Sequence, residues 1–520
     1  MMSSQTQSAK AVRESNDSTQ NFDVLIVGAG LSRVAAAYHL RTSSPGKRFA
    51  ILEGRDVMGG TWDLFRYPGV RSDSDMHTLG YSFRPWPSDK LIAEGALIRD
   101  YIADTAKSTG IARSIQFNTK VVSASWSSAE GRWTVEVAIG PEKQRSYLTC
   151  AFLFMCSGYY DYAQGYTPDW PDMDRYKGKL LHPQFWDDNY EYAGKRVVIV
   201  GSGATAVTLA PAMAAQAAHL TILQRSPSYV VARPSIDLIA KKLQARLPGW
   251  IAGPIIRWKN VLYNVFTFSL ARKRPEMFAK LIHDKAREQL GPDYDMDPHF
   301  KPTYNPWDQR VCLVPDADLF KSIRSGKTDV VTDHIERFTE TGLVLRSGRE
   351  LQADVIVAAT GLKVQLMGGM HVSVDGKPID FGKTLIYKGM MYSDVPNLAS
   401  AFGYTNNSWT LKCELTAKYV CRLLNHMTKK GYAYCTPKRP PVVNEEPGLD
   451  FTSGYVLRAV DVLPKQGAVP PWRNRQNYVS DLIALRFGKI VDGTMEFTKI
   501  DRKHGNAHST VVESSELQPV

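Results

Sequence analysis

Two glycine-rich turns are the residues best suited to chemistry in this chain of 520 residues. The first is Gly28-Ala29-Gly30-Leu31-Ser32-Arg33, and the second is Gly201-Ser202-Gly203-Ala204-Thr205-Ala206. In such a turn the first glycine permits a tight bend, and the second lets the backbone approach a pyrophosphate. The helix that follows directs its first N–H groups at the phosphates, so Ala204 and Thr205 are further candidate contacts. We therefore expect two dinucleotide sites.

The residue that ends the next strand predicts which nucleotide each turn binds. Glu53 follows a strand expected at 49–52, and a carboxylate there accepts hydrogen bonds from an unphosphorylated ribose, as in FAD or NAD. Arg225 and Ser226 end the corresponding strand of the second unit, and a cation with a hydroxyl suits the 2′-phosphate of NADPH. A solvated strand-end charge is the alternative for Arg225. Two nucleotides on one chain imply hydride transfer between them.

Arg33 departs from the pattern, because a small residue normally stands at the third position of the turn so that helix and strand pack closely. We expect its side chain to turn aside, towards solvent or a phosphate. The alternative is that FAD is held weakly, or that the chain is an NADP-binding protein without catalysis. Shortly after Glu53, Gly60, Thr61 and Trp62 end a Gly-Gly segment whose backbone amides are candidates for flavin or phosphate oxygens, although an ordinary glycine turn is the alternative.

The elements needed to position these residues follow from the hydrophobic pattern. Short apolar runs predict strands at 23–27, 49–52, 196–200 and 220–223, with helices at 34–40 and from 204 to about 218. Apolar runs at 152–156 and 354–359 end in small-residue turns, which suits chain crossing between two nucleotide domains. From 226 to 310, helical patterns rich in Trp, Tyr, Arg and Lys replace this rhythm.

The predicted fold is therefore α/β, with two Rossmann-like dinucleotide-binding domains and a helical insertion over the substrate pocket. We assign residues 1–21 to a disordered tail, 22–150 and 362–520 to an FAD-binding domain, 161–225 and 311–361 to an NADP-binding domain, and 226–310 to the insertion.

Composition excludes several other classes of protein. The net charge is +12, but no Lys/Arg-rich run or nucleic-acid motif is present, so we discount nucleic acid. The six cysteines form no C-x-x-C pair and no metal cluster, which fits a reduced cytoplasmic protein. The apolar run 197–223 is interrupted by glycines and reads as strand, turn and helix rather than as a membrane span. The basic aromatic segment 250–259 suits either weak peripheral membrane contact or, as we prefer, a pocket wall or lid.

One segment between the two turns resembles a family fingerprint. Tyr176-Lys177-Gly178-Lys179-Leu180-Leu181-His182-Pro183-Gln184-Phe185-Trp186-Asp187 is similar to the F-x-G-x-x-x-H-x-x-x-W-P/D sequence of type I Baeyer–Villiger monooxygenases, with Tyr176 in place of Phe. The resemblance covers nearly everything from Phe22 to about Leu485. The stretches 58–81, 304–315 and 403–412 look most like the subgroup that includes ethionamide-activating monooxygenases.

This resemblance implies a reaction. NADPH would reduce FAD, O2 would form a flavin C4a-peroxide, and one oxygen atom would enter a ketone beside its carbonyl to give an ester or lactone. Sulfide or thioamide oxygenation would be a side activity. By similarity, Arg310 is the active-site cation, Asp73 is the acid that orients it, and His182 lies at a hinge. Gln309 stands where many relatives have Lys near the 2′-phosphate, so Arg225 would carry more of the coenzyme selectivity.

Two rival enzymes have to be compared with this interpretation. A flavin monooxygenase that oxygenates only nitrogen or sulfur would share most of these features. A flavin disulfide reductase needs a redox cysteine pair, and Cys150 and Cys156 have neither its spacing nor its placement. The expected small-molecule partners are a ketone or sulfide and O2. The chain is expected to be a monomer or a weak homo-oligomer, and its natural ketone is not specified by the sequence.

Overall fold

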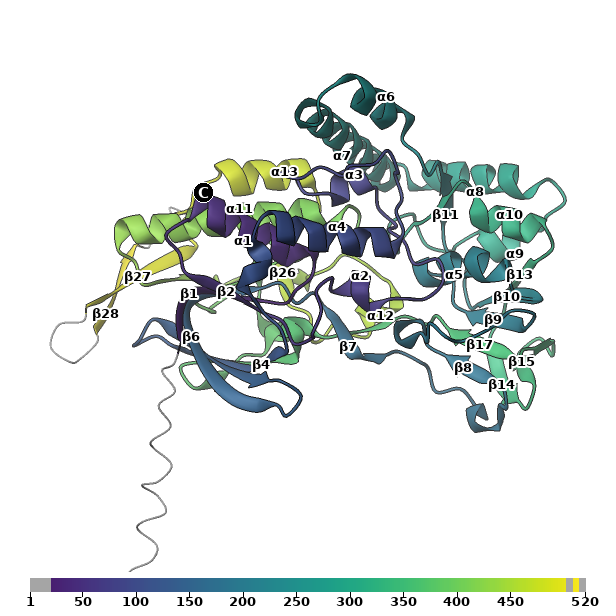
Figure 1. Cartoon of the computed structure of the whole chain (residues 1–520), viewed down its shortest axis with the longest axis horizontal. Coiled ribbons are helices and arrows are strands. Elements are labelled where there is room, and N and C mark those ends of the chain that lie inside the picture. The colour runs from purple at the N-terminus through teal and green to yellow at the C-terminus, as the bar shows by residue number, and fades with distance from the viewer. Residues whose placement is uncertain (1–19, 502–507, 514–520) are drawn as a thin grey trace, which may run out of the picture.

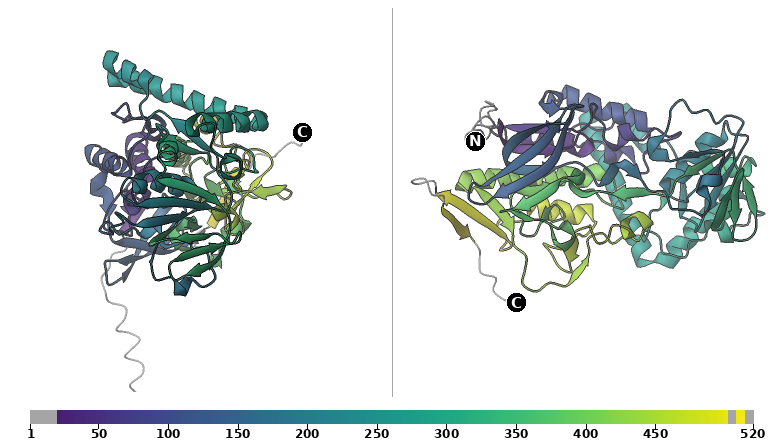
Figure 2. Two further views of the ribbon diagram at one scale, coloured as in Figure 1. Left: turned by 90° about the vertical axis from the view of Figure 1, so that its right-hand side faces the viewer. Right: turned by 90° about the horizontal axis from the view of Figure 1, so that it is seen from below.

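The computed structural model describes residues 20–501 and 508–513 and is built around two separate sheets (Figure 1). The right-hand view of Figure 2 shows these sheets towards opposite ends of the molecule. Most of the expected tail, residues 1–19, lies outside the described residues. Gln20 and Asn21 were also assigned to that tail, but they pair with Leu148 and Thr149 in the first sheet, so the tail boundary was wrong.

The first sheet has nine strands and contains the first glycine turn. Its order is β20-β19-β4-β5-β6-β1-β2-β3, and β23 also pairs with β6. The bounds are β20 Lys377–Pro378, β19 His371–Val374, β4 Thr119–Ser127, β5 Arg132–Ile139, β6 Gln144–Met155, β1 Gln20–Val27, β2 Phe49–Leu52, β3 Ile115–Gln116 and β23 Leu398–Ser400. β1 runs parallel to both β2 and β6, so the carboxyl ends of three strands meet at one edge. Ligands bind at such an edge in open α/β sheets.

The second sheet has five strands in the order β13-β10-β9-β17-β8, and every pairing in it is parallel. The bounds are β13 Thr328–Thr332, β10 His219–Gln224, β9 Arg196–Val200, β17 Val355–Ala358 and β8 Lys179–Leu181. The second glycine turn follows β9, as the first follows β1. The predicted α/β fold with two Rossmann-like units is therefore confirmed.

Helices cover the two sheets and bury their apolar faces. The helices of the first unit are α1 Leu31–Ser43, α2 Thr61–Leu64, α3 Met76–Leu79, α4 Gly95–Ser108 and α11 Trp409–Lys430. α1, α4 and α11 share one apolar core with β1 and β6, which includes Val24, Ile102, Phe154 and Leu423. In the second unit, α5 Ala204–Ala214 and α10 Asp318–Arg324 pack with β9 and β10 around Leu209. Each glycine turn is thus held between a buried strand and a buried helix.

Two short strands join the sheets. β7 (Tyr160–Gly165) leads from the first sheet to the second, β18 (Leu362–Val364) leads back, and the two pair antiparallel. Both follow the small-residue turns predicted from the sequence as crossing points. The geometry makes this two-stranded ribbon the connection between the units.

The predicted insertion contains helices and one strand. It holds β11 Val230–Arg233, α6 Leu238–Arg246, α7 Gly249–Lys273, α8 Pro275–Leu290 and α9 Asp297–Phe300. β11 pairs with β12 (Cys312–Pro315), so the segment is anchored by a short sheet that the helical prediction did not include. The left-hand view of Figure 2 shows the long helix α7 across the top of the molecule. No helix among the described residues combines the length and apolarity that crossing a bilayer requires.

Candidate active site

A cavity of about 620 Å³ lies between the first glycine turn and the start of α5. Many of the candidate residues line it, namely Gly28, Gly30, Glu53, Gly60, Thr61, Trp62, Asp73, Ala204, Thr205 and Arg310. Seven candidates do not line it: Arg33, His182, Gly201, Gly203, Arg225, Ser226 and Gln309. The structure therefore brings residues from both nucleotide units to one cavity.

The first turn is shaped to admit a ligand backbone closely. A Cβ at Gly28, whose φ is +104°, would lie 2.6 Å from the carbonyl oxygen of Cys156, so only glycine fits there. A Cβ at Gly60 would lie 2.8 Å from the Cα of Gly30, so the two glycine segments touch. Gly30 caps α1 without a side-chain hydrogen bond, which leaves the first N–H groups of the helix available. This arrangement fits the pyrophosphate of FAD.

Glu53 stands at the far side of the same turn and is nearly buried, with 9% of its surface exposed. Burial raises the pKa of its carboxyl, while hydrogen bonds from the backbone N–H groups of Arg55 and Ala29 oppose the rise. The Arg55 N–H lies 2.9 Å from Glu53 Oε1. Because Glu53 lines the cavity, its carboxylate can accept hydrogen bonds from a ribose.

Arg33 does not turn towards solvent, so that expectation is wrong. Its side chain lies on α1 with 0% of the residue exposed, and it does not line the cavity. Its Nε, Nη1 and Nη2 atoms have no hydrogen-bond partner among the described residues. Burial lowers the pKa of Arg33, while the charges of Tyr81, Glu53 and Cys156 oppose that shift. The guanidinium packs inside the protein near Tyr81, Glu53 and Cys156, behind the cavity wall, and leaves the first turn open.

The second turn repeats the geometry of the first. A Cβ at Gly201, with φ +146°, would lie 2.3 Å from the carbonyl oxygen of Ala359, which requires glycine. Gly203 has open space around its Cα and caps α5 without a side-chain hydrogen bond. Thr205 lies on the cavity wall beside Tyr67, and burial raises the pKa of Tyr67 to about 12 although its hydrogen bond with Thr205 opposes the rise. This turn can therefore hold a second pyrophosphate next to the first.

Arg225 and Ser226 are exposed at the end of β10, outside the cavity wall. Gln309 is half-buried and also lies outside it. Gln224, just before Arg225, is fixed by hydrogen bonds from its Nε2 to the carbonyl oxygen of His299 and to Thr332 Oγ1. The end of this strand is thus held by side-chain hydrogen bonds, and it presents an exposed cation where the equivalent strand of the first unit presents Glu53.

Arg310 and Asp73 form a two-pronged ion pair on the cavity wall. Arg310 Nη2 donates to Asp73 Oδ1 at 2.9 Å, and Arg310 Nε lies 2.6 Å from Asp73 Oδ2. Burial by itself would lower the pKa of Arg310, but Asp73 raises it and the net shift is upward. Asp73 lies in the loop between α2 and α3, and Arg310 precedes β12. A fixed and permanently charged guanidinium therefore faces the space beside both turns.

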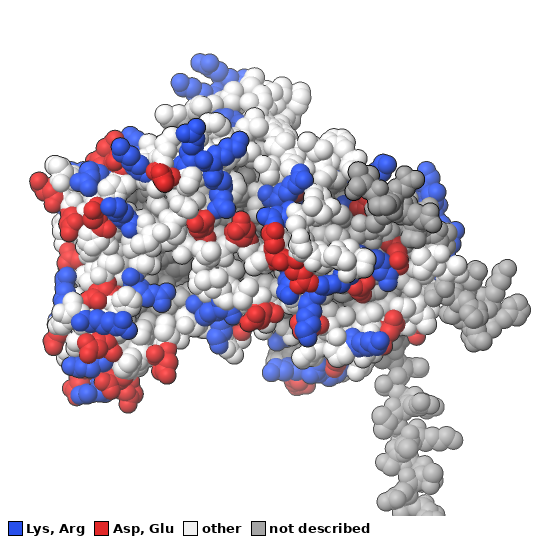
Figure 3. All heavy atoms as spheres, turned by 180° about the vertical axis from the view of Figure 1, so that it is seen from behind, with Lys and Arg blue, Asp and Glu red and all other residues white. Residues whose placement is uncertain are grey.

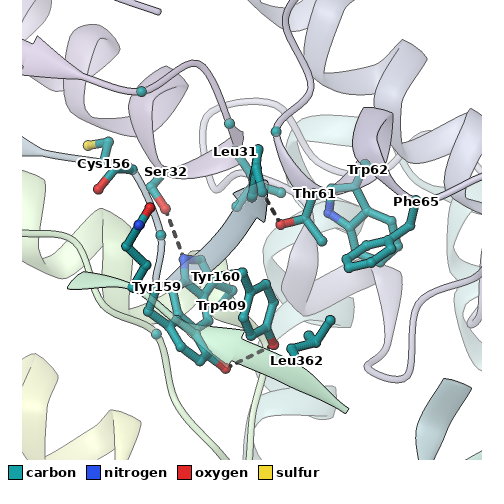
Figure 4. Close-up of a pocket in the computed structure, with 18 of the residues that line it drawn as sticks. Leu31, Ser32, Thr61, Trp62, Phe65, Cys156, Tyr159, Tyr160, Leu362 and Trp409 are labelled. Carbon is teal, nitrogen blue, oxygen red and sulfur yellow. Dashed lines mark hydrogen bonds between the residues drawn. The ribbon is translucent and has the colours of Figure 1, made fainter. Parts of the chain in front are cut away.

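Aromatic side chains that the sequence reasoning missed form much of the remaining wall (Figure 4). Tyr159 and Tyr160 share a hydrogen bond between hydroxyl oxygens 3.0 Å apart, and the Tyr159 ring stacks on Trp409 with centroids 5.5 Å apart. Trp409 Nε1 donates to Ser32 Oγ at 2.9 Å, which ties this wall to the first turn. Burial raises the pKa of both tyrosines, so they stay neutral. An aromatic pair directly after the Ser157-Gly158 turn was the available signal.

His182 lies outside the cavity, against the ribbon that joins the sheets. A Cβ at Gly165 would lie 2.2 Å from its ring, and the backbone N–H of Gln184 donates to its Nδ1 at 3.2 Å. Burial lowers the pKa of His182, while backbone hydrogen bonds to Gly361 and Tyr166 oppose the shift. These contacts give it no access to a substrate in the cavity, and they suit a positioning role between β7 and β18.

The two cysteines considered for a redox pair are separate thiols. Cys150 and Cys156 are free and buried, and burial raises the pKa of Cys150 to about 12. A disulfide reductase needs an accessible thiolate beside its flavin. These thiols do not supply one.

Comparison with known proteins identifies the family of the chain. A model of the flavin-binding monooxygenase-like family matches residues 80–390, and a model of an NAD(P)-binding Rossmann-like domain matches residues 26–87. The FAD-containing monooxygenase EthA of Mycobacterium tuberculosis H37Rv is 52% identical over 92% of this chain and 98% of its own length. A probable FAD-binding monooxygenase, AlmA, of Acinetobacter baylyi is 45% identical over 92% of this chain and 97% of its own length.

Solved structures share the fold at low sequence identity. OTEMO in complex with FAD and NADP has a TM-score of 0.70 at 18% identity, covering 92% of this chain and all of that one (100%). A steroid monooxygenase bound to NADP has a TM-score of 0.67 at 22% identity, covering 81% and 88%. The predicted cofactors, FAD and NADPH, agree with these comparisons. The family model spans more than half of the chain and the relatives match almost all of it, so this chain belongs to the flavin-binding monooxygenase-like family.

Proposed function

We propose that this protein is an FAD- and NADPH-dependent Baeyer–Villiger monooxygenase. It inserts one oxygen atom of O2 beside a ketone carbonyl to give an ester or lactone, with sulfide or thioamide oxygenation as a side activity. The observation that carries this proposal is the two-pronged Arg310–Asp73 pair on the wall of a cavity that both nucleotide turns reach.

Each nucleotide has a defined set of residues that could bind it. The first turn, Glu53 and the 60–62 segment would hold FAD, because they surround one end of the cavity with backbone N–H groups and a ribose acceptor. The second turn would hold NADPH, with Arg225 and Ser226 directed at its 2′-phosphate. The flavin, once reduced by NADPH, supplies the activation of O2.

Arg310 stabilises negative charge in this mechanism. Oxygen insertion places negative charge on the oxygen of the ketone, and a preorganised cation stabilises that charge most where water is scarce. Asp73 holds both prongs of the guanidinium, so Arg310 needs no reorganisation when the charge develops. Because the pKa of Arg310 is raised, it does not act as a proton donor.

The aromatic wall has a different task. Tyr159, Tyr160 and Trp409 present ring surface to the cavity, and Leu362, Met367 and Tyr455 extend that wall. Apolar lining of this kind excludes water from the reacting groups and suits a substrate that is mostly hydrocarbon. We infer that the carbonyl of a lipophilic ketone points at Arg310 while its carbon skeleton contacts the rings.

Substitution of Arg310 tests the proposal. We expect Arg310→Ala to leave NADPH-dependent flavin reduction largely intact and to lower ester formation about 100- to 1000-fold, as loss of a preorganised donor does elsewhere. Arg310→Lys should recover only part, because a lysine cannot make the two-pronged contact with Asp73. Arg145→Ala is the matched control, because Arg145 is an exposed arginine of β6 that pairs with Glu136 of β5. Normal ketone turnover by Arg310→Ala would remove this residue from the mechanism.

A panel of linear, cyclic and aryl ketones, with sulfides alongside, tests the substrate class. NADPH consumption is measured together with product identity, so that oxygenation is separated from wasteful peroxide release. Ester or lactone products support the proposal. Sulfoxides without any ester or lactone would leave a flavin monooxygenase that lacks Baeyer–Villiger activity.

A further inference from the structure

A stripe of large apolar side chains runs along the outer face of α7. It consists of Trp258, Leu262 and Phe266, which recur every four residues and so lie along one side of the helix, together with Trp250 near the N-terminal end of the helix. Trp250 is 77% exposed and Phe266 is 66% exposed. Of the eleven tryptophans in the chain, which all lie within the described residues, only Trp250 and Trp258 are exposed. α6, which packs on α7, adds exposed Leu238 and Ile239.

The structure contradicts the expectation that this segment forms a pocket wall or lid, because no residue between 209 and 309 lines the cavity. The opposite face of α7 is already occupied by the protein. Arg257 is buried and ion-paired with Glu414 at 2.8 Å, and Asn264 Nδ2 donates to Asp75 Oδ2 at 3.0 Å. Val261 packs with Tyr404, which lines the cavity. One side of α7 therefore contacts the rest of the protein, and the apolar stripe is exposed.

The segment that carries this stripe has charged side chains of one sign only. Residues 238–274 contain eight Lys and Arg and no Asp or Glu. Four of these cations, Lys242, Arg246, Lys273 and Arg274, are exposed and make no ion pair among the described residues. Figure 3 shows the same feature from behind, where Lys and Arg side chains stand among uncharged ones on the projecting top of the molecule, without acidic side chains between them.

We propose that the α6–α7 face docks on the surface of an anionic lipid bilayer. Tryptophan is favoured at the boundary between headgroups and acyl chains, and Lys and Arg beside it are attracted to anionic headgroups. The exposed stripe and its cations supply both on one face. Docking here would place the cavity one helix away from the bilayer, through the contact of Val261 with Tyr404.

A second copy of the chain fits this face less well. A symmetric dimer would bring the same patch of each copy together and so place its cations opposite identical cations, with no acid in 238–274 to offset them. An anionic surface meets the same charges with the opposite sign. The docking surface depends on exposure and charge alone, so it is independent of the proposed ketone chemistry.

Flotation of the full chain with lipid vesicles tests the proposal. We expect flotation with vesicles of equal parts phosphatidylcholine and phosphatidylglycerol, little with phosphatidylcholine alone, and loss of binding as salt is raised. The double variant Trp250→Glu/Phe266→Glu should reduce flotation at least about tenfold, because it places acid where the stripe enters the interface. Val442→Glu makes the same kind of change at another highly exposed apolar residue and should float like the unmodified chain.

Tryptophan fluorescence gives a second measurement of the same contact. Bromine-labelled acyl chains should quench the unmodified chain, and Trp250→Phe should lose part of that quenching. Absence of flotation at low salt, equal flotation of the double variant, or equal binding to neutral vesicles would each overturn the proposal. A dimer in sedimentation that the double variant dissociates, without flotation, would assign the face to a second copy.

Discussion

The two glycine turns differ most at their third small-residue position. Arg33 holds it in the first turn and Ala206 in the second, and both residues are 0% exposed. Ala206 packs among Val197, Leu209 and other apolar side chains, as close contact between helix and strand requires. Arg33 places a guanidinium at the equivalent point of α1, and the described part of the chain gives it no hydrogen-bond partner. Similar turns therefore tolerate buried side chains of very different size and charge at this position.

The difference teaches that the ligand face and the packing face of the turn are separate. Arg33 points into the protein on the packing face, so it leaves the cavity open beside Gly28 and Gly30. Arg33 therefore affects the stability of the protein and the charge of the nearby Glu53, but it does not block access to the cavity. A buried polar group without a partner destabilises a protein, and a charged group does so more. The site is therefore not blocked, and the question is how much Arg33 weakens FAD binding.

The largest effect is expected from moving the arginine to the second turn. Ala206→Arg should lower the free energy of unfolding by about 3–5 kcal/mol, the range seen when a buried charge is left uncompensated. Chemical denaturation measures it, and Ala206→Gly, which should cost about 1 kcal/mol, is the control for helix propensity. A fully stable Ala206→Arg protein would show that this position accepts an arginine in either turn, and the contrast would disappear.

The second largest effect is expected at the strand ends. Arg225 follows β10 in the second unit, where Glu53 follows β2 in the first. Arg225→Ala should raise the KM for NADPH about 10- to 100-fold, as loss of a charge-assisted hydrogen bond does, and leave the KM for NADH nearly unchanged. Steady-state kinetics with both coenzymes measure it. Gln309→Lys is the reciprocal test and should tighten NADPH binding if the position lies near the 2′-phosphate. Equal losses for both coenzymes in Arg225→Ala would mean that Arg225 supports the fold and not the phosphate.

The third effect is expected from Arg33→Gly, which removes a bulky side chain from the first turn. The free energy of unfolding should rise by about 1–3 kcal/mol, which is the usual cost of overpacking, and FAD should bind more tightly. Thermal unfolding followed by flavin release, and titration of the apoprotein with FAD, measure the two. Arg33→Met keeps most of the volume and removes the charge, so it separates crowding from desolvation. FAD retention that is equal or weaker in Arg33→Gly would defeat the idea that Arg33 impairs the site.

Local sequence patterns predict much of the fold and part of the site. The strands at 49–52 and 196–200 have the predicted bounds, because short apolar runs with clear polar or glycine boundaries have few alternatives. The direction of the Arg33 side chain could not be predicted, since a long residue on a helix can turn towards solvent or core. The outward face of α7 was misassigned for a related reason: aromatic and basic residues suit a pocket wall and an interface equally. The roles of Tyr159 and Tyr160 depend on long-range packing.

The smallest expected effect is a pH dependence that links Arg33 to Glu53. Burial raises the pKa of Glu53, and the charge of Arg33 partly opposes that rise. Removal of Arg33 should therefore move the pKa of Glu53 further up. A ribose hydroxyl donates to the ionised carboxylate, so FAD affinity should fall as the pH falls through this pKa, and the fall should begin at higher pH in Arg33→Gly than in the unmodified chain.

FAD titration across a pH series checks this coupling, with Arg33→Gly/Glu53→Gln as the control that cannot ionise. The control should bind FAD with little pH dependence, because an amide accepts the same hydrogen bond without a titration. If Arg33→Gly and the unmodified chain lose FAD at the same pH, the guanidinium exerts no charge effect on the ribose acid. Arg33 would then act on the first turn through its volume alone, and the two turns would differ in packing but not in electrostatics.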